Sequence, residues 1–339
     1  MRYLLNISFY LLLVCIQSGQ AQQVSLINDY LHNPGSLNPG MVGWEDITAV
    51  TAMYRHQWTD MPQNPITANL NFRHFYEKHN MAIGAGITHD QTGPTSMTGL
   101  NLQYAYHLKF KPEGSGQEKR NRLSIGLSLS LYQYRLDGDK LRYNDTGDPI
   151  IVANTAYRFL PDAGVGLFYY NDLYYVGVSV PQILSLNVQF ESDNALSSIR
   201  RIAHINLNAG IKIPIRGAGE SLTKSSLKEI DKHVLIPAIW LKYAPTSPLN
   251  FFAGMRYMWH QKLLFGFGGA TDGSLVTDMS VLIKKRIRIG YTLSIPVNGL
   301  LAQTGTNHEI VISYLFGAGG NGWFFSSVDQ QMTHKGKKN

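Results

Sequence analysis

Residues 122–134, RLSIGLSLSLYQY, contain the clearest pattern in the chain. Leucine or isoleucine occupies every second position from Leu123 to Leu131, and serine or glycine fills the positions between them. This period of two indicates a β-strand with one apolar face and one small, polar face. Such a strand suits a soluble β-sandwich or propeller, and it equally suits a membrane barrel whose apolar face contacts lipid.

The same alternation recurs along the chain, for example in PITANLNFRHFY (65–76) and GLNLQYAYHLKF (99–110). Most of the alternating segments reach the length of about 9 to 11 residues that a tilted membrane strand needs, whereas globular strands average about 5 to 6. We therefore predict an all-β protein that forms a transmembrane antiparallel β-barrel of about 14 strands, FadL-like in type. The fourteen segments span approximately 46–57, 65–76, 80–90, 97–109, 121–135, 162–170, 172–181, 201–213, 232–243, 249–258, 261–270, 274–284, 286–296 and 307–316.

The connections between these segments suit a barrel with both ends of the chain in the periplasm. Short links at 77–80, 170–172, 259–262 and 284–286 fall where periplasmic turns belong. The longest outward connections are then 136–161 and 182–200. We expect the basic residues Arg73, Lys109 and Arg135 to face the lumen, because a charge facing lipid near mid-membrane costs about 2–4 kcal/mol.

The N-terminal residues predict export. The apolar run that follows Arg2, with the small residues Gly19 and Ala21 behind it, fits a signal peptide cleaved after Ala21. We divide the chain into a signal peptide (1–21), a short N-terminal segment (22–45), an outer-membrane barrel (46–316) and a C-terminal tail (317–339). The N-terminal segment is short for a plug, and no later apolar run approaches the 18 residues of a helical membrane span.

The composition disfavours catalysis. Cys15 is the only cysteine and lies within the predicted signal, so the mature chain has no cysteine nucleophile or zinc–thiolate site. The eleven histidines are scattered. The GAGGNG sequence (317–322) follows a predicted strand, but no predicted helix begins there, and a dinucleotide site requires one. The net charge of +7 is spread along the chain, which does not indicate a nucleic-acid partner. We expect no enzyme, no cofactor and no metal site.

Four short elements stand outside the alternation. They are an N-P-G-x-x-G element, a Y-R-x-Q-W element followed by prolines, a G-P turn, and an H-E-I opening of the last strand. Through these elements the whole mature chain resembles the PorP/SprF family of outer-membrane proteins of the type IX secretion system of Bacteroidetes. The residues that carry the resemblance, all expected near the barrel rim, are Asn38, Pro39, Gly40, Tyr54, Arg55, Gln57, Trp58, Pro62, Gly93, Pro94, His308 and Glu309.

The resemblance implies a non-catalytic accessory of type IX secretion in the outer membrane. Such a protein assists the export or surface anchoring of a specific secreted protein, such as a gliding adhesin, through the C-terminal domain of that protein. Periplasmic components of the secretion machine and outer-membrane lipid are further implied partners. A FadL-like transporter or porin for a small solute is the alternative, and a soluble periplasmic β protein is a third hypothesis.

Two stretches are candidates for partner contact. The Tyr54–Trp58 stretch (YRHQW) is interpreted first as a rim motif, with Trp58 at the membrane interface and Arg55 facing the lumen, and direct contact with a partner stays open. In the long connection 136–161, Arg142, Tyr143, Tyr157 and Arg158 are the candidate anchors. Loops on a rigid scaffold often carry recognition, and Tyr and Arg are favoured at interfaces.

Overall fold

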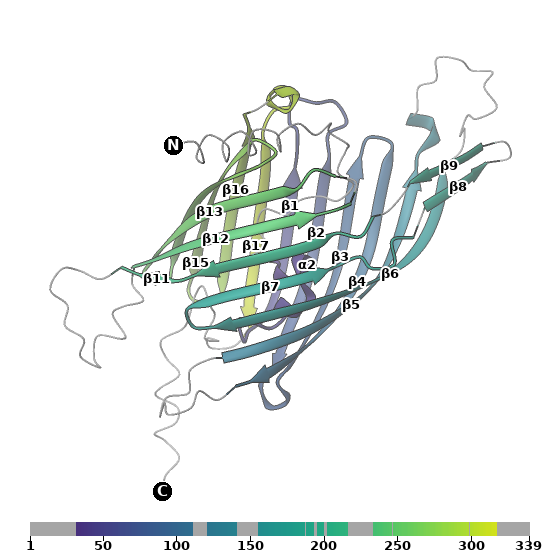
Figure 1. The fold of residues 1–339 in the computed structure, drawn as a ribbon. Helices are drawn as coiled ribbons and strands as arrows, with labels where there is room; N and C mark the ends of the chain where they lie inside the picture. The colour runs from purple at the N-terminus through teal and green to yellow at the C-terminus, as the bar shows by residue number, and fades with distance from the viewer. Residues whose placement is uncertain are drawn as a thin grey trace, which may run out of the picture.

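The computed structural model describes residues 32–110, 121–140, 155–186, 188–192, 195–199, 202–215, 233–245, 247–297 and 299–316. Its main sheet is antiparallel, with strands paired in sequence order. β1 (Thr48–His56) pairs with β17 (Asn307–Phe316), and β10 (Ile205–Ile211) pairs with both β7 (Tyr174–Val180) and β12 (His233–Tyr243). These pairings close the sheet into a barrel (Figure 1).

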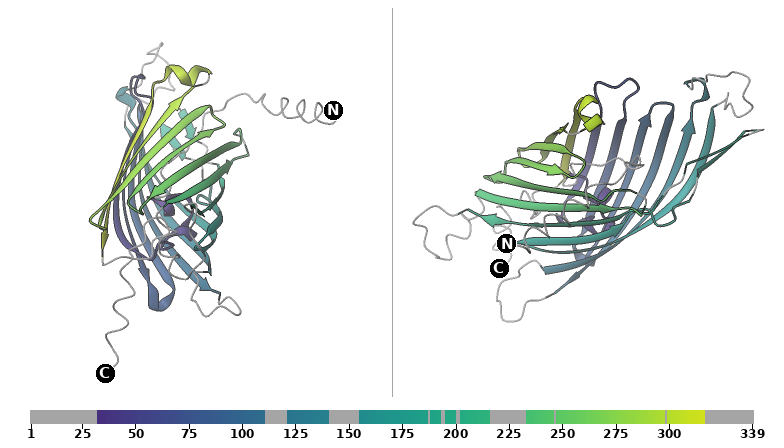
Figure 2. Two further views of the ribbon diagram at one scale, coloured as in Figure 1. Left: turned by 90° about the vertical axis from the view of Figure 1, so that its left-hand side faces the viewer. Right: turned by 45° about the horizontal axis from the view of Figure 1, so that its top comes forward.

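The sheet has 15 strands when β10 and the two residues of β11 (Ile213–Pro214) are counted separately. Both lie along the same neighbour, β12, so they form one barrel strand, and the barrel has fourteen. Figure 2 shows the tilt of the strands around the barrel. The other strands are β2 (Ile66–Tyr76), β3 (Met81–Thr92), β4 (Thr95–Lys109), β5 (Asn121–Leu136), β6 (Ala156–Asn171), β13 (Asn250–Trp259), β14 (Leu263–Ala270), β15 (Ser274–Ile283) and β16 (Ile287–Pro296).

The fourteen predicted segments each coincide with a barrel strand, so the predicted fold class is confirmed. The predicted loop 136–161 is wrong at its second end, because β6 begins at Ala156 and pairs there with Leu136. The predicted loop 182–200 contains a separate hairpin, formed by β8 (Val188–Ser192) and β9 (Ala195–Ile199). The predicted signal peptide and C-terminal tail lie outside the described residues.

The described part of the chain contains little helix. Its helical elements are α2 (Pro34–Leu37), η1 (Pro39–Met41), η2 (Glu77–His79), η3 (Gly138–Lys140) and η6 (Gly299–Gln303). None of the helices described is long and apolar enough to cross a membrane.

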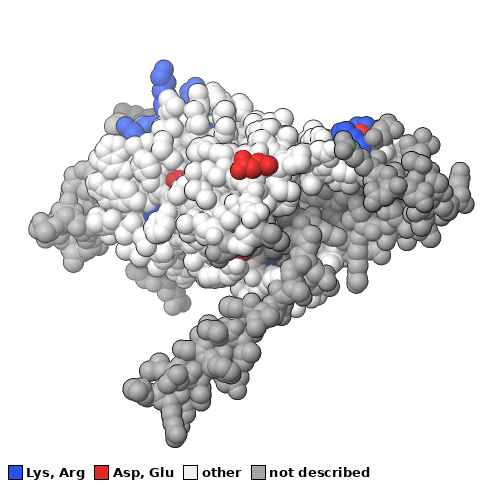
Figure 3. Space-filling view, turned by 90° about the horizontal axis from the view of Figure 1, so that it is seen from above, with Lys and Arg blue, Asp and Glu red and all other residues white. Residues whose placement is uncertain are grey.

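Exposure follows the alternation of the sequence. On β5, Leu127 and Leu129 are 53% and 67% exposed, whereas Ser128 and Ser130 are buried in the interior. Other strands likewise direct leucine, isoleucine, phenylalanine and tyrosine outward, as a lipid-facing surface requires. Seen from above, most of the described surface is uncharged, and the described Lys, Arg, Asp and Glu residues appear in a few small groups (Figure 3).

The three expected lumenal cations behave differently. Arg73 is buried inside the barrel, as predicted. Lys109 is exposed at the last position of β4. The prediction for Arg135 is wrong, because this residue belongs to the outward phase of β5, where its guanidinium contacts Asp137 and lies 5.9 Å from the centre of the Tyr157 ring.

The two ends of the barrel differ. One end carries the short connections after β2, β6, β13 and β15, and we call it the turn end. The other carries the connections after β1, β3, β5, β7, β12, β14 and β16, and we call it the loop end. Residues 32–47 lie inside the barrel, and residue 47 leads directly into β1 at the turn end. Figure 1 shows α2 inside the ring of strands, so the described part of the N-terminal segment, which seemed short for a plug, occupies the lumen.

The orientation of β5 generates a direct prediction. Leu127→Arg places a charge against lipid and should destabilise the folded barrel by about 2–4 kcal/mol. Ser128→Arg points the same side chain into the lumen and should cost less. Urea titration of each variant in lipid vesicles, followed by the loss of heat-modifiable gel migration, measures the difference. Equal losses of stability in the two variants would contradict the assignment of faces.

Candidate functional site

The lumenal segment, residues 32–47, begins with a repeated sequence. Asn33-Pro34-Gly35 and Asn38-Pro39-Gly40 each start a short helical turn, α2 and η1, with proline at the first position. Proline suits that position because its fixed φ is already helical and its missing N–H would have no partner there. The Asn38 side chain completes the second turn by accepting a hydrogen bond of 2.8 Å from the Gly40 N–H. The repeat therefore produces a compact coil rather than another strand.

Asn38 also ties this coil to the barrel wall. Its side-chain nitrogen donates to the backbone oxygens of Leu167 on β6 and Val178 on β7, at 3.1 and 3.3 Å. From the wall, the hydroxyl of Ser179 donates to the backbone oxygen of Leu37 at 2.7 Å. These contacts explain why Asn38 is completely buried inside the barrel rather than at the rim, where the family motif was expected to lie.

Glycines of the wall make room for the coil. A Cβ atom added to Gly126 on β5 would collide with the backbone of Pro39 and Gly40, and one added to Gly166 on β6 would collide with the Asn38 side chain. The serine and glycine face of β5 thus packs against the lumenal segment. Backbone atoms cannot move aside as a flexible side chain can, so Gly126 is the more restrictive of these two positions.

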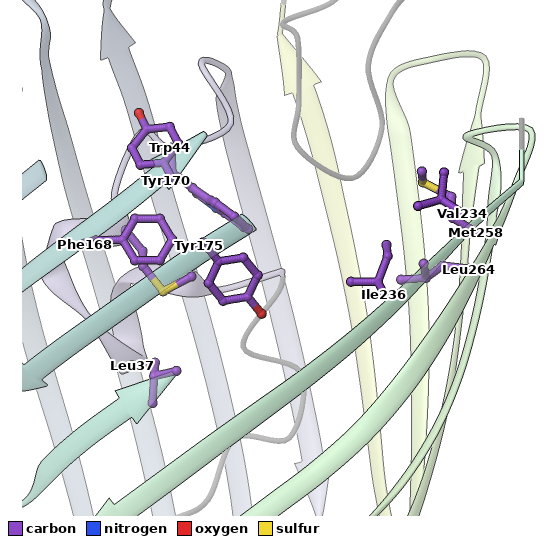
Figure 4. Close-up of a cluster of buried hydrophobic side chains, with 10 residues drawn as sticks. Leu37, Trp44, Phe168, Tyr170, Tyr175, Val234, Ile236, Met258 and Leu264 are labelled. Atoms are coloured by element: carbon purple, nitrogen blue, oxygen red, sulfur yellow. The ribbon is translucent and has the colours of Figure 1, made fainter. Parts of the chain in front are cut away.

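An apolar cluster surrounds the second half of the lumenal segment (Figure 4). Trp44 is fully buried and meets the rings of Phe168 and Tyr175 edge-on, with centroid distances of 5.3 and 5.4 Å. The cluster joins the segment to β6 and β7 on one side and to β12, β13 and β14 on the other, and fills the lumen toward the turn end. Its members are Leu37, Met41, Trp44, Phe168, Tyr170, Tyr175, Val234, Ile236, Met258 and Leu264.

Two buried ion pairs and one partly buried pair complete the attachment. The Glu45 carboxylate lies 2.7 Å from a guanidinium nitrogen of Arg73 on β2 and 3.0 Å from one of Arg288 on β16. Asp46 forms a third pair with Arg122 on β5, at 2.6 Å. Glu45 lies outside the membrane-spanning strands. Burial alone would raise the pKa of its carboxyl, but Arg288 and Arg73 outweigh burial and hold the pKa below its ordinary value.

Two of the family elements meet at the loop end. Arg55 and Glu309 are register partners on β1 and β17, and their side chains pair at 3.8 Å while both are buried. Trp58 has φ of 53°, and its backbone N–H donates to the side-chain oxygen of Asn307 at 3.0 Å. The first and last strands are thus joined by two motifs that lie near opposite ends of the barrel sequence.

The G-P turn belongs to the same rim. The Gly93 N–H donates to the backbone oxygen of Gln63 in the connection after β1, at 3.1 Å. The backbone oxygen of Pro94 accepts a 2.9 Å hydrogen bond from the N–H of Asp137, directly after β5. The turn therefore links three neighbouring connections, and Pro62 lies exposed in the first of them.

The remaining predicted residues are spread over the barrel. Tyr54 points outward on β1 and is 47% exposed. The backbone N–H of Gln57 donates to the Pro65 oxygen at 2.9 Å, and the Nδ1 atom of His308 lies 2.7 Å from the Tyr291 hydroxyl. Tyr157 and Arg158 are exposed at the start of β6. Arg142 and Tyr143 lie outside the described residues.

A polar cavity lies between α2 and the loop end. It has a volume of about 140 Å³. Sequence reasoning missed this site, although it had placed Ser128, one of the lining residues, on the small, polar face of its strand. The lining residues are Gly35, Ser36, Leu37, Asn69, Asn71, Thr88, Asn101, Gln103, Ser128, Tyr132, Pro181, Gln182, His204, Asn206, Trp240 and Lys242. Within the described part of the chain, no group of three or more His, Cys, Asp or Glu residues could hold a metal ion.

Comparisons with known proteins identify a family. Residues 19–314 match the family of type IX secretion system membrane proteins PorP/SprF. No curated protein matches the chain. The fold is similar to the toluene transporter TodX of P. putida, with 12% identity, a TM-score of 0.46, and coverage of 84% of this chain and 93% of that one. It is also similar to the outer-membrane protein Omp33 of Acinetobacter baumannii, with 7% identity, a TM-score of 0.42, and coverage of 80% and 98%.

The close contact between Gly126 and the Asn38–Gly40 turn predicts how the lumenal segment can be displaced. Gly126→Val should push the Asn38–Gly40 turn off β5 and expose Met41, which is fully buried. The measurement is maleimide labelling of Met41→Cys, which is specific because Cys15 is the only native cysteine. Labelling should accelerate at least about tenfold, since a buried site reacts only when it opens. Gly269→Val is the control, because its Cβ would meet only ordinary contacts. Equal labelling rates in both backgrounds would contradict the account.

The Glu45 ion pairs predict a pH dependence. Because the folded pKa is lowered, the pairs stabilise fully above the ordinary value of 4.5, and their contribution is lost as the pH falls through the lowered pKa. Glu45→Gln should destabilise the protein at pH 7 by about 3–5 kcal/mol, because it leaves two buried cations unmatched. Melting temperatures between pH 7 and 3 should fall less steeply for Glu45→Gln than for the wild type. Asp60→Asn, at an exposed loop position, should keep the wild-type slope.

Proposed function

Because the chain belongs to the PorP/SprF family of type IX secretion system membrane proteins, we propose that it assists the export or the surface anchoring of one specific secreted protein, such as a gliding adhesin. The protein is an outer-membrane β-barrel, and its family points to secretion or transport rather than to catalysis. The contact would involve the C-terminal domain of the secreted protein. Periplasmic components of the secretion machine would contact the turn end.

The observation that carries the proposal is the filled lumen. Residues 32–47 occupy the turn-end half of the barrel and are fixed there by Asn38, Trp44 and Glu45. A polypeptide on its way to the surface could not pass through a barrel in this state. The barrel would therefore act on a secreted protein by holding it from outside rather than by conducting it.

The loop end offers a raised surface for such a contact. β6 pairs with β7 only from Val165 to Tyr170, so its first nine residues stand beyond the end of β7 with β5 on their other side. In this part of β6, Tyr157 and Phe159 are 49% and 63% exposed, and Arg158 is exposed between them. Tyr and Arg on a rigid support are favoured interface anchors. We call these nine residues of β6, together with the part of β5 that pairs with them, the β5–β6 arm. The residues after η3 lead into this arm, so the loop and the arm would form one recognition surface.

A FadL-like transporter remains the competing function, and it makes a different demand on the structure. Transport would require the lumenal segment to leave its position against Gly126 and Gly166 and to break the Glu45 ion pairs. In a transporter, changes to the outward loops would leave function intact, whereas changes to the lumenal residues would abolish it. This contrast separates the two functions in one experiment.

Replacing residues 141–154 by a four-residue Gly-Ser linker should leave a folded barrel, because β5, η3 and β6 all lie outside the replaced stretch. It should abolish surface display of one specific secreted protein. The assay is surface labelling of the secreted proteins beside quantified barrel in the same membranes.

Arg55→Ala is the comparison variant. It removes one partner of the Arg55–Glu309 pair and should lower the amount of barrel, with display falling in the same proportion. Normal display after loop replacement, together with loss of uptake of a small solute, would replace the proposed function by transport.

A further inference from the structure

The cavity above α2 has two chemically different walls. β2, β3, β4 and β5 contribute amides and hydroxyls from one side. The other side is formed by His204, which directly precedes β10, by Asn206 of β10, and by Trp240 and Lys242 of β12. Pro181 and Gln182, which follow β7 directly, also line the space, so it extends toward the loop end. α2 closes it on the side of the turn end.

The amide wall is held in place by its own hydrogen bonds. The side-chain nitrogen of Asn101 donates to the Ser130 hydroxyl at 2.6 Å, and that of Gln103 donates to the backbone oxygen of Gly35 at 2.9 Å. Each of these amide nitrogens keeps a second N–H, and the amide oxygens of both residues can accept, so this wall offers both donors and acceptors. This side of the cavity is suited to the hydroxyl groups of a ligand.

The opposite wall contains residues with buried polar atoms that lack a partner within the described part of the chain. The indole Nε1 of Trp240 is buried and has no hydrogen-bond partner within the described part of the chain, and the same holds for the side-chain oxygen of Asn206. Asn206 is only 5% exposed, and its nitrogen already donates to the Leu37 oxygen at 3.3 Å. A buried polar atom without a partner is costly, and a ligand that supplies the partner removes this cost.

The charges of the lining residues favour an anion. Lys242 and His204 are basic, and both are buried. No lining residue of the cavity among those described is Asp or Glu. Ring surfaces are also available from Tyr132 and Trp240. Amide acceptors, an N–H donor, aromatic rings and a cation together match a small ligand that carries hydroxyl groups on one side and a carboxylate on the other.

We propose that this cavity binds an acidic monosaccharide, with the sugar hydroxyls on the Asn101 and Gln103 side and the carboxylate near Lys242 and the Trp240 N–H. The volume of about 140 Å³ suits one small ligand rather than a chain of several residues. The site lies in the lumen and is independent of the outward loops. Binding should therefore persist when residues 141–154 are replaced.

The test is isothermal titration of the full-length barrel in detergent with D-glucuronate, D-glucose and triglycine. We expect D-glucuronate to bind at least about tenfold more tightly than D-glucose, the difference that one charge-assisted hydrogen bond supplies. Equal binding of both sugars, or no binding of D-glucuronate, overturns the proposal. Binding of triglycine in place of D-glucuronate also overturns it and assigns the site to the carboxyl end of a peptide.

Two variants locate the site. Lys242→Met should weaken D-glucuronate binding about tenfold and leave the weak D-glucose binding unchanged. Trp240→Phe keeps an aromatic ring at this position but removes the indole N–H, and it should weaken D-glucuronate binding severalfold. Tyr243→Phe, on the outward face of the same strand, should have no effect. Heat-modifiable gel migration establishes that each variant is folded, and unchanged binding in folded Lys242→Met protein would overturn the proposal.

Discussion

Closing fourteen strands into a barrel creates more interior space than inward side chains alone can fill, since about eight strands is the size at which they suffice. In this protein residues 32–47 fill the turn-end half of that space. The filling is specific, because one carboxylate, Glu45, is held between guanidinium groups from β2 and β16. A buried carboxylate needs such partners, and without it the two buried cations would repel each other. The rest of the interior is arranged around this attachment.

The lumen is thereby divided into two compartments. Toward the turn end, Trp44 and the aromatic residues of β6 and β7 form an apolar core of the kind found in soluble proteins. Toward the loop end, the interior remains polar and leaves a cavity, which is the ligand site that we propose. A secreted polypeptide and a small ligand would therefore meet different parts of the molecule: the first would contact the β5–β6 arm and its loop, and the second the cavity above α2.

Alternation in the sequence was sufficient to predict the strands, because facing lipid imposes a period of two on each strand separately. The lumenal prediction for Arg135 did not follow this alternation, which puts residue 135 in phase with Leu127 and Leu131 on the outward face. The position of the lumenal segment could not be predicted, because its contacts join residues far apart in sequence, as Glu45 and Arg288 do. Arg55 and Glu309 were recognised as separate motifs, and only closure of the barrel makes them a pair.

Electrical conductance tests most directly whether residues 32–47 close the lumen. The measurement compares wild-type protein with a variant lacking residues 32–44, each inserted into a planar lipid bilayer. The account predicts no steady open state for the wild type and a stable, ion-conducting channel for the deletion variant. A wild-type protein that conducts steadily, or a folded deletion variant that stays closed, would contradict the conclusion that this segment plugs the barrel.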